Sequence, residues 1–139
     1  MENPGKLLLR FSNAGVEKEF GPGPLSLEVN HRTDDSEIKV KKADGKIIGW
    51  ARYTIEDRKV SLDNLFARKT NWHVGTSIVA ALAGLESPLP IVVQPDAITR
   101  SYYEKMGFVN HPFEKGKLWL PDIKMLKYKF MIEKVKEQK

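Results

Sequence analysis

The chain has 139 residues, of which 41% are hydrophobic and 29% charged, and its formal net charge is +5. This length predicts one domain, residues 1–139, with one hydrophobic core, and the composition excludes an intrinsically disordered chain. The sequence has no cysteine and only three scattered histidines, which excludes disulfides and cysteine-based zinc sites and predicts no metal site.

The first residues predict two short strands, at 6–11 (KLLLRF) and 25–29 (LSLEV). The Gly-Pro-Gly-Pro sequence at 21–24 between them cannot form regular structure. No basic segment followed by an apolar one opens the sequence, and the longest apolar run, residues 78–85, is too short to cross a membrane. These features predict a cytoplasmic protein that does not enter a membrane.

A three-stranded antiparallel meander is predicted next. Residues 37–42 and 46–55 alternate polar and apolar side chains on either side of Asp44-Gly45. This dipeptide between alternating runs is a strong hairpin signal, in which both central residues of the turn are expected to adopt positive φ. A polar break then leads to a third alternating run at 60–66.

The period changes to that of a helix in the second half of the chain. Apolar side chains recur at helical spacing from Val74 to Leu85, and small residues cover much of the remaining surface. This pattern predicts a helix packed closely on a sheet. Asn71 is the predicted N-cap, and Gly84 with the prolines that follow is predicted to end the helix.

A buried strand and a second helix are predicted to follow. The apolar run Ile91–Val93 between prolines is typical of a strand buried on both faces. Asp96 is the predicted N-cap of a helix that runs to Met106 and stops at Gly107. Residues 108–113 then predict another strand.

The C-terminal segment allows two interpretations. Apolar side chains at 126–132 alternate with lysines, as in a strand, but a spacing that includes Ile123 also suits a helix; we favour a strand to about residue 132. Because a helix between two strands requires a crossover, at least one pair of strands is expected to be parallel. The predicted fold class is therefore α/β (α+β), a single mixed, mostly antiparallel sheet with helices on both faces.

The segment from Asp96 to Phe108 resembles the C-terminal signature of the GNAT superfamily of acyl-coenzyme-A-dependent N-acetyltransferases. There, a helix that opens with Asn or a similar polar residue ends in Tyr-Glu-Lys-x-Gly-Phe, and residues 103–108 keep that ending (YEKMGF). Asp96 stands where the family often has Asn, and Thr99 where it often has Ala. The alternative is a helix end with a left-handed glycine and no further role. The resemblance spans residues 37–132 and implies a GNAT-like fold.

The family's cofactor loop, Arg/Gln-x-x-Gly-x-Gly/Ala, is only partly kept. With its last glycine placed on Gly75, Thr70 replaces Arg/Gln and His73 replaces the first glycine. Backbone amides at a helix N-terminus favour anions, so the resemblance implies that the pyrophosphate of acetyl-coenzyme A lies here. Trp72 and His73 could instead cover the helix start without touching a ligand. The residues implied in cofactor binding at this loop and on the next helix are Asn71, Trp72, His73, Val74, Gly75, Thr76 and Asp96.

The resemblance also implies where the thioester would lie. Two neighbouring parallel strands, at 60–66 and 91–94, would splay apart around it. A backbone N–H of the first strand would face the thioester oxygen and stabilise negative charge on it. The candidates for this contact are Leu65, Phe66 and Ala67.

Tyr103 matches the tyrosine that protonates the departing thiolate in the family. A phenol of pKa about 10 is suited to a thiol of pKa about 8.5. Tyr102, about 100° round the helix, would then face away from the site. A half-buried helix tyrosine with no catalytic role is the alternative for Tyr103. Asp63 is the preferred candidate for the general base, with Glu56 as the other acidic residue nearby.

The function implied is transfer of an acetyl group from acetyl-coenzyme A to an amine that the sequence does not identify. Dimers are common among such proteins, so a homodimer is among the expected states. The alternative is a catalytically degenerate GNAT-like domain that acts as a binding or regulatory module, since the loop lacks two motif residues. A nucleic-acid-binding domain is a third interpretation, because residues 124–139 are rich in lysine, but a solvated surface explains these lysines equally well.

Overall fold

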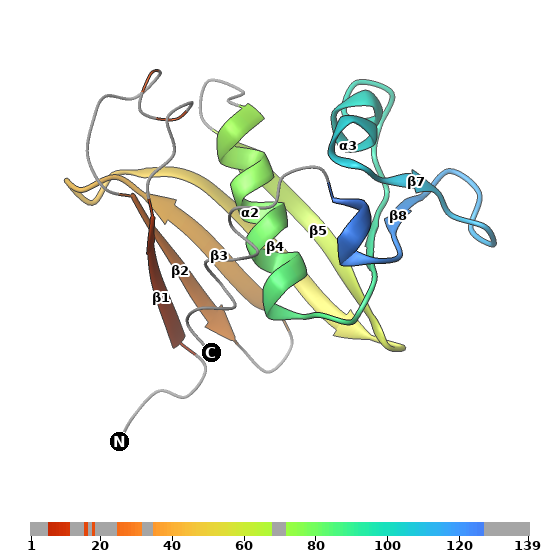
Figure 1. Ribbon diagram of the computed structural model, residues 1–139, viewed down its shortest axis with the longest axis horizontal. Helices are drawn as coiled ribbons and strands as arrows, with labels where there is room; N and C mark the ends of the chain where they lie inside the picture. The colour runs from red at the N-terminus through yellow and green to blue at the C-terminus, as the bar shows by residue number, and fades with distance from the viewer. Residues whose placement is uncertain are drawn as a thin grey trace.

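The structure, a computed structural model, describes residues 6–11, 16, 18, 25–31, 35–67 and 72–126. Figure 1 shows a twisted sheet with one long helix lying across it. The strands are β1 (Lys6–Phe11), β2 (Leu25–His31), β3 (Ser36–Lys41), β4 (Ile47–Glu56), β5 (Lys59–Ala67), β6 (Ile91–Val93), β7 (Val109–Asn110) and β8 (Leu118–Leu120). The described helices are α2 (Trp72–Leu85) and α3 (Arg100–Met106), followed by the 3-10 turn η2 (Ile123–Met125).

The strands form a single sheet in the order β1-β2-β3-β4-β5-β6-β8-β7. Neighbouring strands in the described part of the chain are antiparallel except for β5 and β6, which are parallel. Helix α2 makes the crossover between these two strands. The predicted single, mixed and mostly antiparallel sheet is therefore confirmed.

One face of the sheet packs against the hydrophobic core. Leu25, Leu27 and Val29 of β2 are buried, and the residues between them are partly exposed. Ile38 and Val40 of β3 are buried as well, and all five belong to one cluster with the apolar side of α2. The alternation of apolar and polar residues in the sequence therefore reflects a sheet that packs one face against the core, as expected for antiparallel strands.

The two hairpin turns of the meander differ from one another in backbone conformation. In the turn between β3 and β4, Gly45 has φ +90° and donates its N–H to the Lys42 carbonyl at 2.9 Å. Asp44 is not among the described residues with positive φ, so the prediction that both turn residues adopt positive φ was wrong there. Asp57 and Arg58, between β4 and β5, both have positive φ, at 50° and 60°. The turn between β4 and β5 is therefore of a type that favours glycine, but its two central residues are not glycines.

Replacing Arg58 with glycine should raise the free energy of unfolding by about 0.5–1 kcal/mol. Left-handed backbone costs an L-residue about 1–2 kcal/mol, and the greater freedom of glycine in the unfolded chain cancels part of the gain. Asp44→Gly is the matched control, because Asp44 accepts a hydrogen bond from the Lys46 N–H at 2.9 Å and should lose stability on replacement. Urea denaturation measures both; equal signs for the two variants would contradict this account.

Helix α2 packs closely on the sheet, as predicted. A Cβ placed on Gly49 of β4 would overlap the Val74 side chain and lie 3.2 Å from the Ile78 side chain. Glycine at this position therefore lets the helix approach the strand. The helix begins at Trp72 and continues through Gly84 to Leu85. Asn71, the predicted N-cap, lies outside the described residues.

The elements after α2 agree with the sequence in part. All three residues of β6 are buried, as predicted. Helix α3 begins at Arg100 rather than directly after Asp96, because residues 97–99 form a turn that the Asp96 carboxylate caps. Gly107, with φ +120°, ends the helix as predicted.

The last part of the sheet was not predicted well. The strand expected at 108–113 is reduced to β7, and the three-residue strand β8, which pairs with both β6 and β7, was missed. Its three residues are too few to show a period. Residues 123–125 form a 3-10 turn, and Leu126 is buried. Most of the strand predicted to about residue 132 lies outside the described residues. No helix in the described part of the chain is long and apolar enough to cross a membrane.

Candidate functional site

Strands β5 and β6 separate soon after they meet. They pair only at Val60↔Ile91 and Ser61↔Val92, with the Val60 N–H donating to the Pro90 carbonyl at 2.8 Å. β6 then ends at Val93, whereas β5 continues to Ala67. Within the described residues, the remainder of β5 has no partner strand on this side. The predicted divergence of these two parallel strands is therefore present, and we call this region the split.

A β-bulge lies where the split opens. Tyr53 of β4 pairs with Leu62 of β5, but Arg52 pairs with Asn64, so Asp63 is an extra residue in β5. A bulge bends its strand and increases the local twist, and this one turns β5 away at the point where it leaves β6. The bulge was not predicted from the sequence. The available signal was the pair of consecutive exposed polar residues, Asp63 and Asn64, which breaks the alternation.

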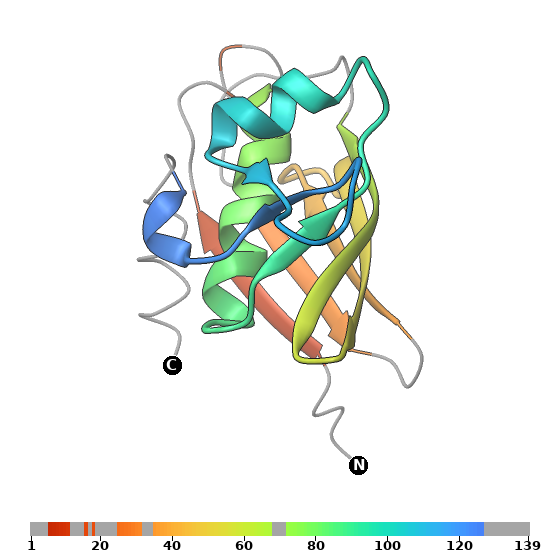
Figure 2. The same cartoon turned by 90° about the vertical axis from the view of Figure 1, so that its right-hand side faces the viewer.

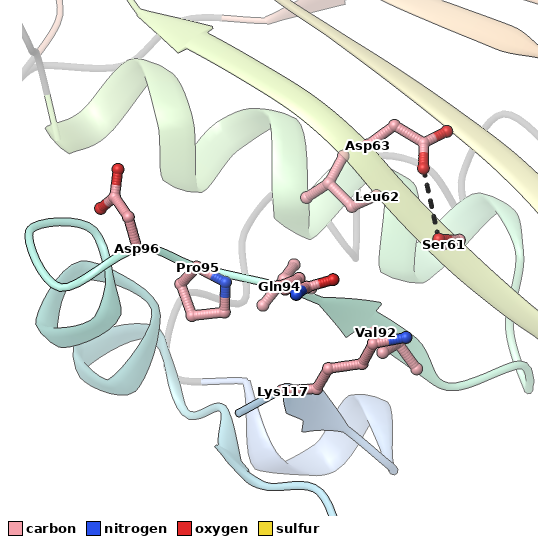
Figure 3. A pocket seen from close by; sticks show the side chains of 9 residues that line it. Ser61, Leu62, Asp63, Val92, Gln94, Pro95, Asp96 and Lys117 are labelled. Atoms are coloured by element: carbon pink, nitrogen blue, oxygen red, sulfur yellow. Dashed lines mark hydrogen bonds between the residues drawn. The ribbon is translucent and has the colours of Figure 1, made fainter. Parts of the chain in front are cut away.

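The first hollow along the split is a cleft of about 500 Å³, which we call the Asp63 cleft (Figure 3). The Asp63 side chain turns along β5 toward Ser61, whose hydroxyl donates to it at 3.3 Å. The Thr54 hydroxyl donates to its other carboxylate oxygen at 3.5 Å. The cleft is lined by Ser61, Leu62, Asp63, Val92, Val93, Gln94, Pro95, Asp96 and Lys117.

Two further charged groups border the Asp63 cleft. The Lys117 ammonium donates to the Glu114 carboxylate at 3.0 Å, so its charge is already paired. Asp96 lies at the far end of the cleft, beyond Gln94 and Pro95. Hydrogen bonds from the Thr99 backbone N–H and hydroxyl hold the pKa of the Asp96 carboxyl below its usual value. The Asp96 carboxylate therefore caps the turn that precedes α3. Of the two aspartates that line the cleft, Asp63 is the one available to contact a ligand.

The second hollow, the tyrosine pocket, has a volume of about 340 Å³. It is lined by Leu65, Phe66, Ala67, Ile98, Thr99, Tyr102 and Tyr103. The structure therefore brings the three predicted β5 residues together with Tyr103. Phe66 is also 46% exposed and stacks on Trp50, with ring centroids 6.1 Å apart.

Both tyrosines are held in an apolar setting. Tyr103 is 8% exposed, and its ring packs edge-on against Phe108 and Tyr102, each with a centroid distance of 5.4 Å. Burial, with a smaller contribution from the charge of Asp96, raises the pKa of Tyr103 to about 12, and burial also raises the pKa of Tyr102. Both phenols are therefore protonated at neutral pH. No described residue forms a hydrogen bond with either hydroxyl.

The expectation that Tyr102 faces away from the site was wrong. Figures 1 and 2 both show α3 near the end of α2 where that helix begins. The Tyr102 hydroxyl lies against Gly75 so closely that a Cβ on Gly75 would overlap it. Glycine at position 75 is therefore required by the packing of Tyr102, a reason that the loop motif did not supply.

The remaining predicted cofactor residues belong to the start of α2. Trp72 and His73 are its first two residues. The side chains of Val74 and Thr76 are buried, so only their backbone could face a ligand. The site predicted from the sequence thus divides into the Asp63 cleft, the tyrosine pocket and the first turn of α2.

No family model matches the sequence, and no curated protein matches it. Among solved structures, the PaiA N-acetyltransferase from Thermoplasma acidophilum in complex with coenzyme A is 18% identical, with a TM-score of 0.51, over 62% of this chain and 58% of that one. Mutant forms of the spermidine/spermine N-acetyltransferase SpeG from Vibrio cholerae are 13% identical, with a TM-score of 0.52, over 65% and 68% of the two chains. YhhK from E. coli bound to coenzyme A is 13% identical, with a TM-score of 0.52, over 82% and 96%. At these identities the likeness establishes the fold, and the chain has the GNAT-like fold that residues 103–108 predicted.

Proposed function

We propose that the chain is an acyl-coenzyme-A-dependent N-acyltransferase that transfers an acetyl group from acetyl-coenzyme A to an amine. The proposal rests on the split between β5 and β6, which is bordered by the Asp63 cleft and the tyrosine pocket. A strand edge without a partner strand offers backbone donors and acceptors to an extended ligand, as in peptide recognition by strand addition. The GNAT-like fold and the coenzyme A bound in PaiA and YhhK support this assignment.

The residues of the tyrosine pocket suit the reaction. Attack of the amine on the thioester carbonyl places negative charge on its oxygen, which a backbone N–H between Leu65 and Ala67 would stabilise. The C–S bond then breaks, and the Tyr103 hydroxyl donates its proton to the departing sulfur. The pocket keeps this phenol protonated at neutral pH, which a proton donor requires.

The amine would approach through the Asp63 cleft. Its carboxylate accepts hydrogen bonds from two hydroxyls and forms no ion pair with a described residue. A carboxylate in this state attracts a protonated amine and can accept the proton that the amine must lose before attack. The cleft and the tyrosine pocket both border β5, so an amine and a thioester could meet along this strand.

Titration with coenzyme A tests the binding half of the proposal. In ¹⁵N-labelled protein we expect amide shifts at residues 65–67 and 71–76, and few elsewhere. Release of free thiol from acetyl-coenzyme A in the presence of candidate amines tests the catalytic half. The chain has no cysteine, so a thiol-reactive dye would detect only the product.

The outcomes separate the alternatives. Shifts confined to other surfaces, or none below millimolar ligand, would contradict coenzyme A binding at the split. Binding at the expected residues without thiol release over a broad panel of amines would favour a binding or regulatory module.

A further inference from the structure

We propose that Tyr102 is a ligand-recognition residue whose hydroxyl donates a hydrogen bond to a diphosphate oxygen of coenzyme A at the first turn of α2. This inference rests on the proposed function. It assigns separate tasks to two adjacent tyrosines, with Tyr102 holding the ligand and Tyr103 protonating the leaving group.

The Tyr102 hydroxyl lies beside the start of α2. It lies against Gly75, in the first turn of α2, while the ring lines the tyrosine pocket. Amides at the start of a helix lack intrahelical acceptors, and the helix dipole favours negative charge there. A phenol O–H beside this turn therefore adds a side-chain donor to a place that already suits an anion.

The hydroxyl groups of the tyrosine pocket support the same role. Tyr103 is 8% exposed, and neither its hydroxyl nor that of Tyr102 has a hydrogen-bond partner in the described part of the chain. Buried polar groups in native proteins are nearly always paired, and an unpaired one is costly. Both tyrosines line one pocket, and the unpaired Tyr102 hydroxyl beside Gly75 points to a polar ligand that accepts its hydrogen bond.

The Tyr102 and Tyr103 hydroxyls would contact different parts of coenzyme A. Tyr102 reaches the start of α2, whereas Tyr103 packs its ring against Phe108 and lines the pocket beside β5. Consecutive helix residues point about 100° apart, which accounts for the divergence. Burial keeps the pKa of Tyr102 above its usual value, so the group is a donor throughout the neutral range.

The sequence of the loop before α2 is consistent with a ligand-binding role for Tyr102. Thr70 and His73 stand where the family motif has Arg/Gln and glycine. A donor supplied by α3 can offset the loss of the long Arg/Gln side chain from the loop. The position of Tyr102 also accounts for the glycine at position 75, because a Cβ there would overlap the Tyr102 hydroxyl.

Calorimetry with coenzyme A on the full chain tests the inference. Tyr102→Phe keeps the ring against Gly75 and removes only the donor, so the melting temperature should change little. The dissociation constant for coenzyme A should rise roughly 10- to 100-fold, the effect of a lost hydrogen bond to a charged group. Tyr103→Phe is the matched control and should leave the affinity within about twofold while lowering turnover.

Two spectroscopic measurements report the contact directly. At saturation, the ³¹P resonances of the bound diphosphate should move in Tyr102→Phe and keep their wild-type positions in Tyr103→Phe. In wild-type protein with ¹³C-labelled tyrosine, the Cζ resonance of Tyr102 should shift on coenzyme A binding, which requires no substitution.

The possible results distinguish a failure of coenzyme A binding at the split from a failure of the role of Tyr102 alone. Wild-type protein that fails to bind coenzyme A would overturn the proposed function and this inference together. Normal wild-type binding with unchanged affinity and ³¹P resonances in Tyr102→Phe would overturn the role of Tyr102 alone. An equal loss of affinity in both tyrosine variants would show a general effect on the pocket and reject the division of tasks.

Discussion

Tyr103→Phe should lower the turnover of acetyl transfer about 10²- to 10⁴-fold and leave the affinity for coenzyme A nearly unchanged. The substitution removes the proton donor but keeps the ring that packs against Phe108 and Tyr102. Because the Tyr103 hydroxyl has no partner among the described residues, its removal should cost little or no stability. Single-turnover thiol release and calorimetry measure the two effects separately.

The raised pKa of Tyr103 shapes the expected pH dependence. A phenol with a pKa of about 12 is a weaker acid than free tyrosine, but the departing thiolate shares the same apolar pocket, where burial raises its pKa as well. Tyr103 stays protonated up to about pH 12, so activity should not fall through this group at pH 9–10. Since its pKa is higher in the folded state, the associated stability is present below pH 10.0 and is lost as the pH rises toward 12.

Tyr53→Phe is the control for loss of a tyrosine hydroxyl elsewhere. Tyr53 is fully buried in β4, donates to the Glu86 carboxylate at 2.9 Å and is not among the residues that line either hollow. Its replacement should reduce stability by about 1.5–3 kcal/mol, because the lost hydrogen bond is to a charged group, and leave turnover unchanged. Full activity of Tyr103→Phe toward an identified amine would mean that water protonates the sulfur.

Gly75→Ala should abolish detectable coenzyme A binding and lower the free energy of unfolding by about 1–3 kcal/mol. The added Cβ would overlap the Tyr102 hydroxyl and lie 2.8 Å from its Cζ, so the ring must leave its place beside α2. Gly75→Glu adds negative charge to the same bulk and should also abolish binding. A steric account based on the loop alone would predict lost binding without this loss of stability.

A double-variant cycle separates the ring contact from other effects of the alanine. With Tyr102→Ala as background, the obstacle is absent, and Gly75→Ala should become neutral or stabilise the protein by up to about 1 kcal/mol through helix propensity. Urea denaturation of the four proteins gives the coupling directly. The same destabilisation in both backgrounds would show that Tyr102 is not what requires glycine at position 75.

Much of the fold could be predicted because it is encoded in short-range patterns. Alternating polar and apolar residues identified β2 to β5, and helical spacing identified α2, since burial of one face imposes a period of 2 or 3.6 residues. The ending at residues 103–108 predicted the GNAT-like fold and the glycine stop at Gly107. These signals need no knowledge of which residues meet across the sheet.

The site depended on contacts between residues far apart in the chain. Strand β8 is recognisable only through its pairing with β6 and β7, and the bulge at Asp63 only through the register between β4 and β5. The contact of Tyr102 with Gly75 joins two helices separated by a strand.

The amino-acid pattern was therefore sufficient to predict most of the elements and a mixed, mostly antiparallel sheet, and the resemblance at residues 103–108 added one candidate proton donor. That both tyrosines line one pocket, and that Gly75 accommodates one of them, became visible only when the packing of α2 and α3 was known. This is because the period of the apolar residues shows which face of an element is buried, whereas the residues that this face contacts depend on the close packing of the whole core.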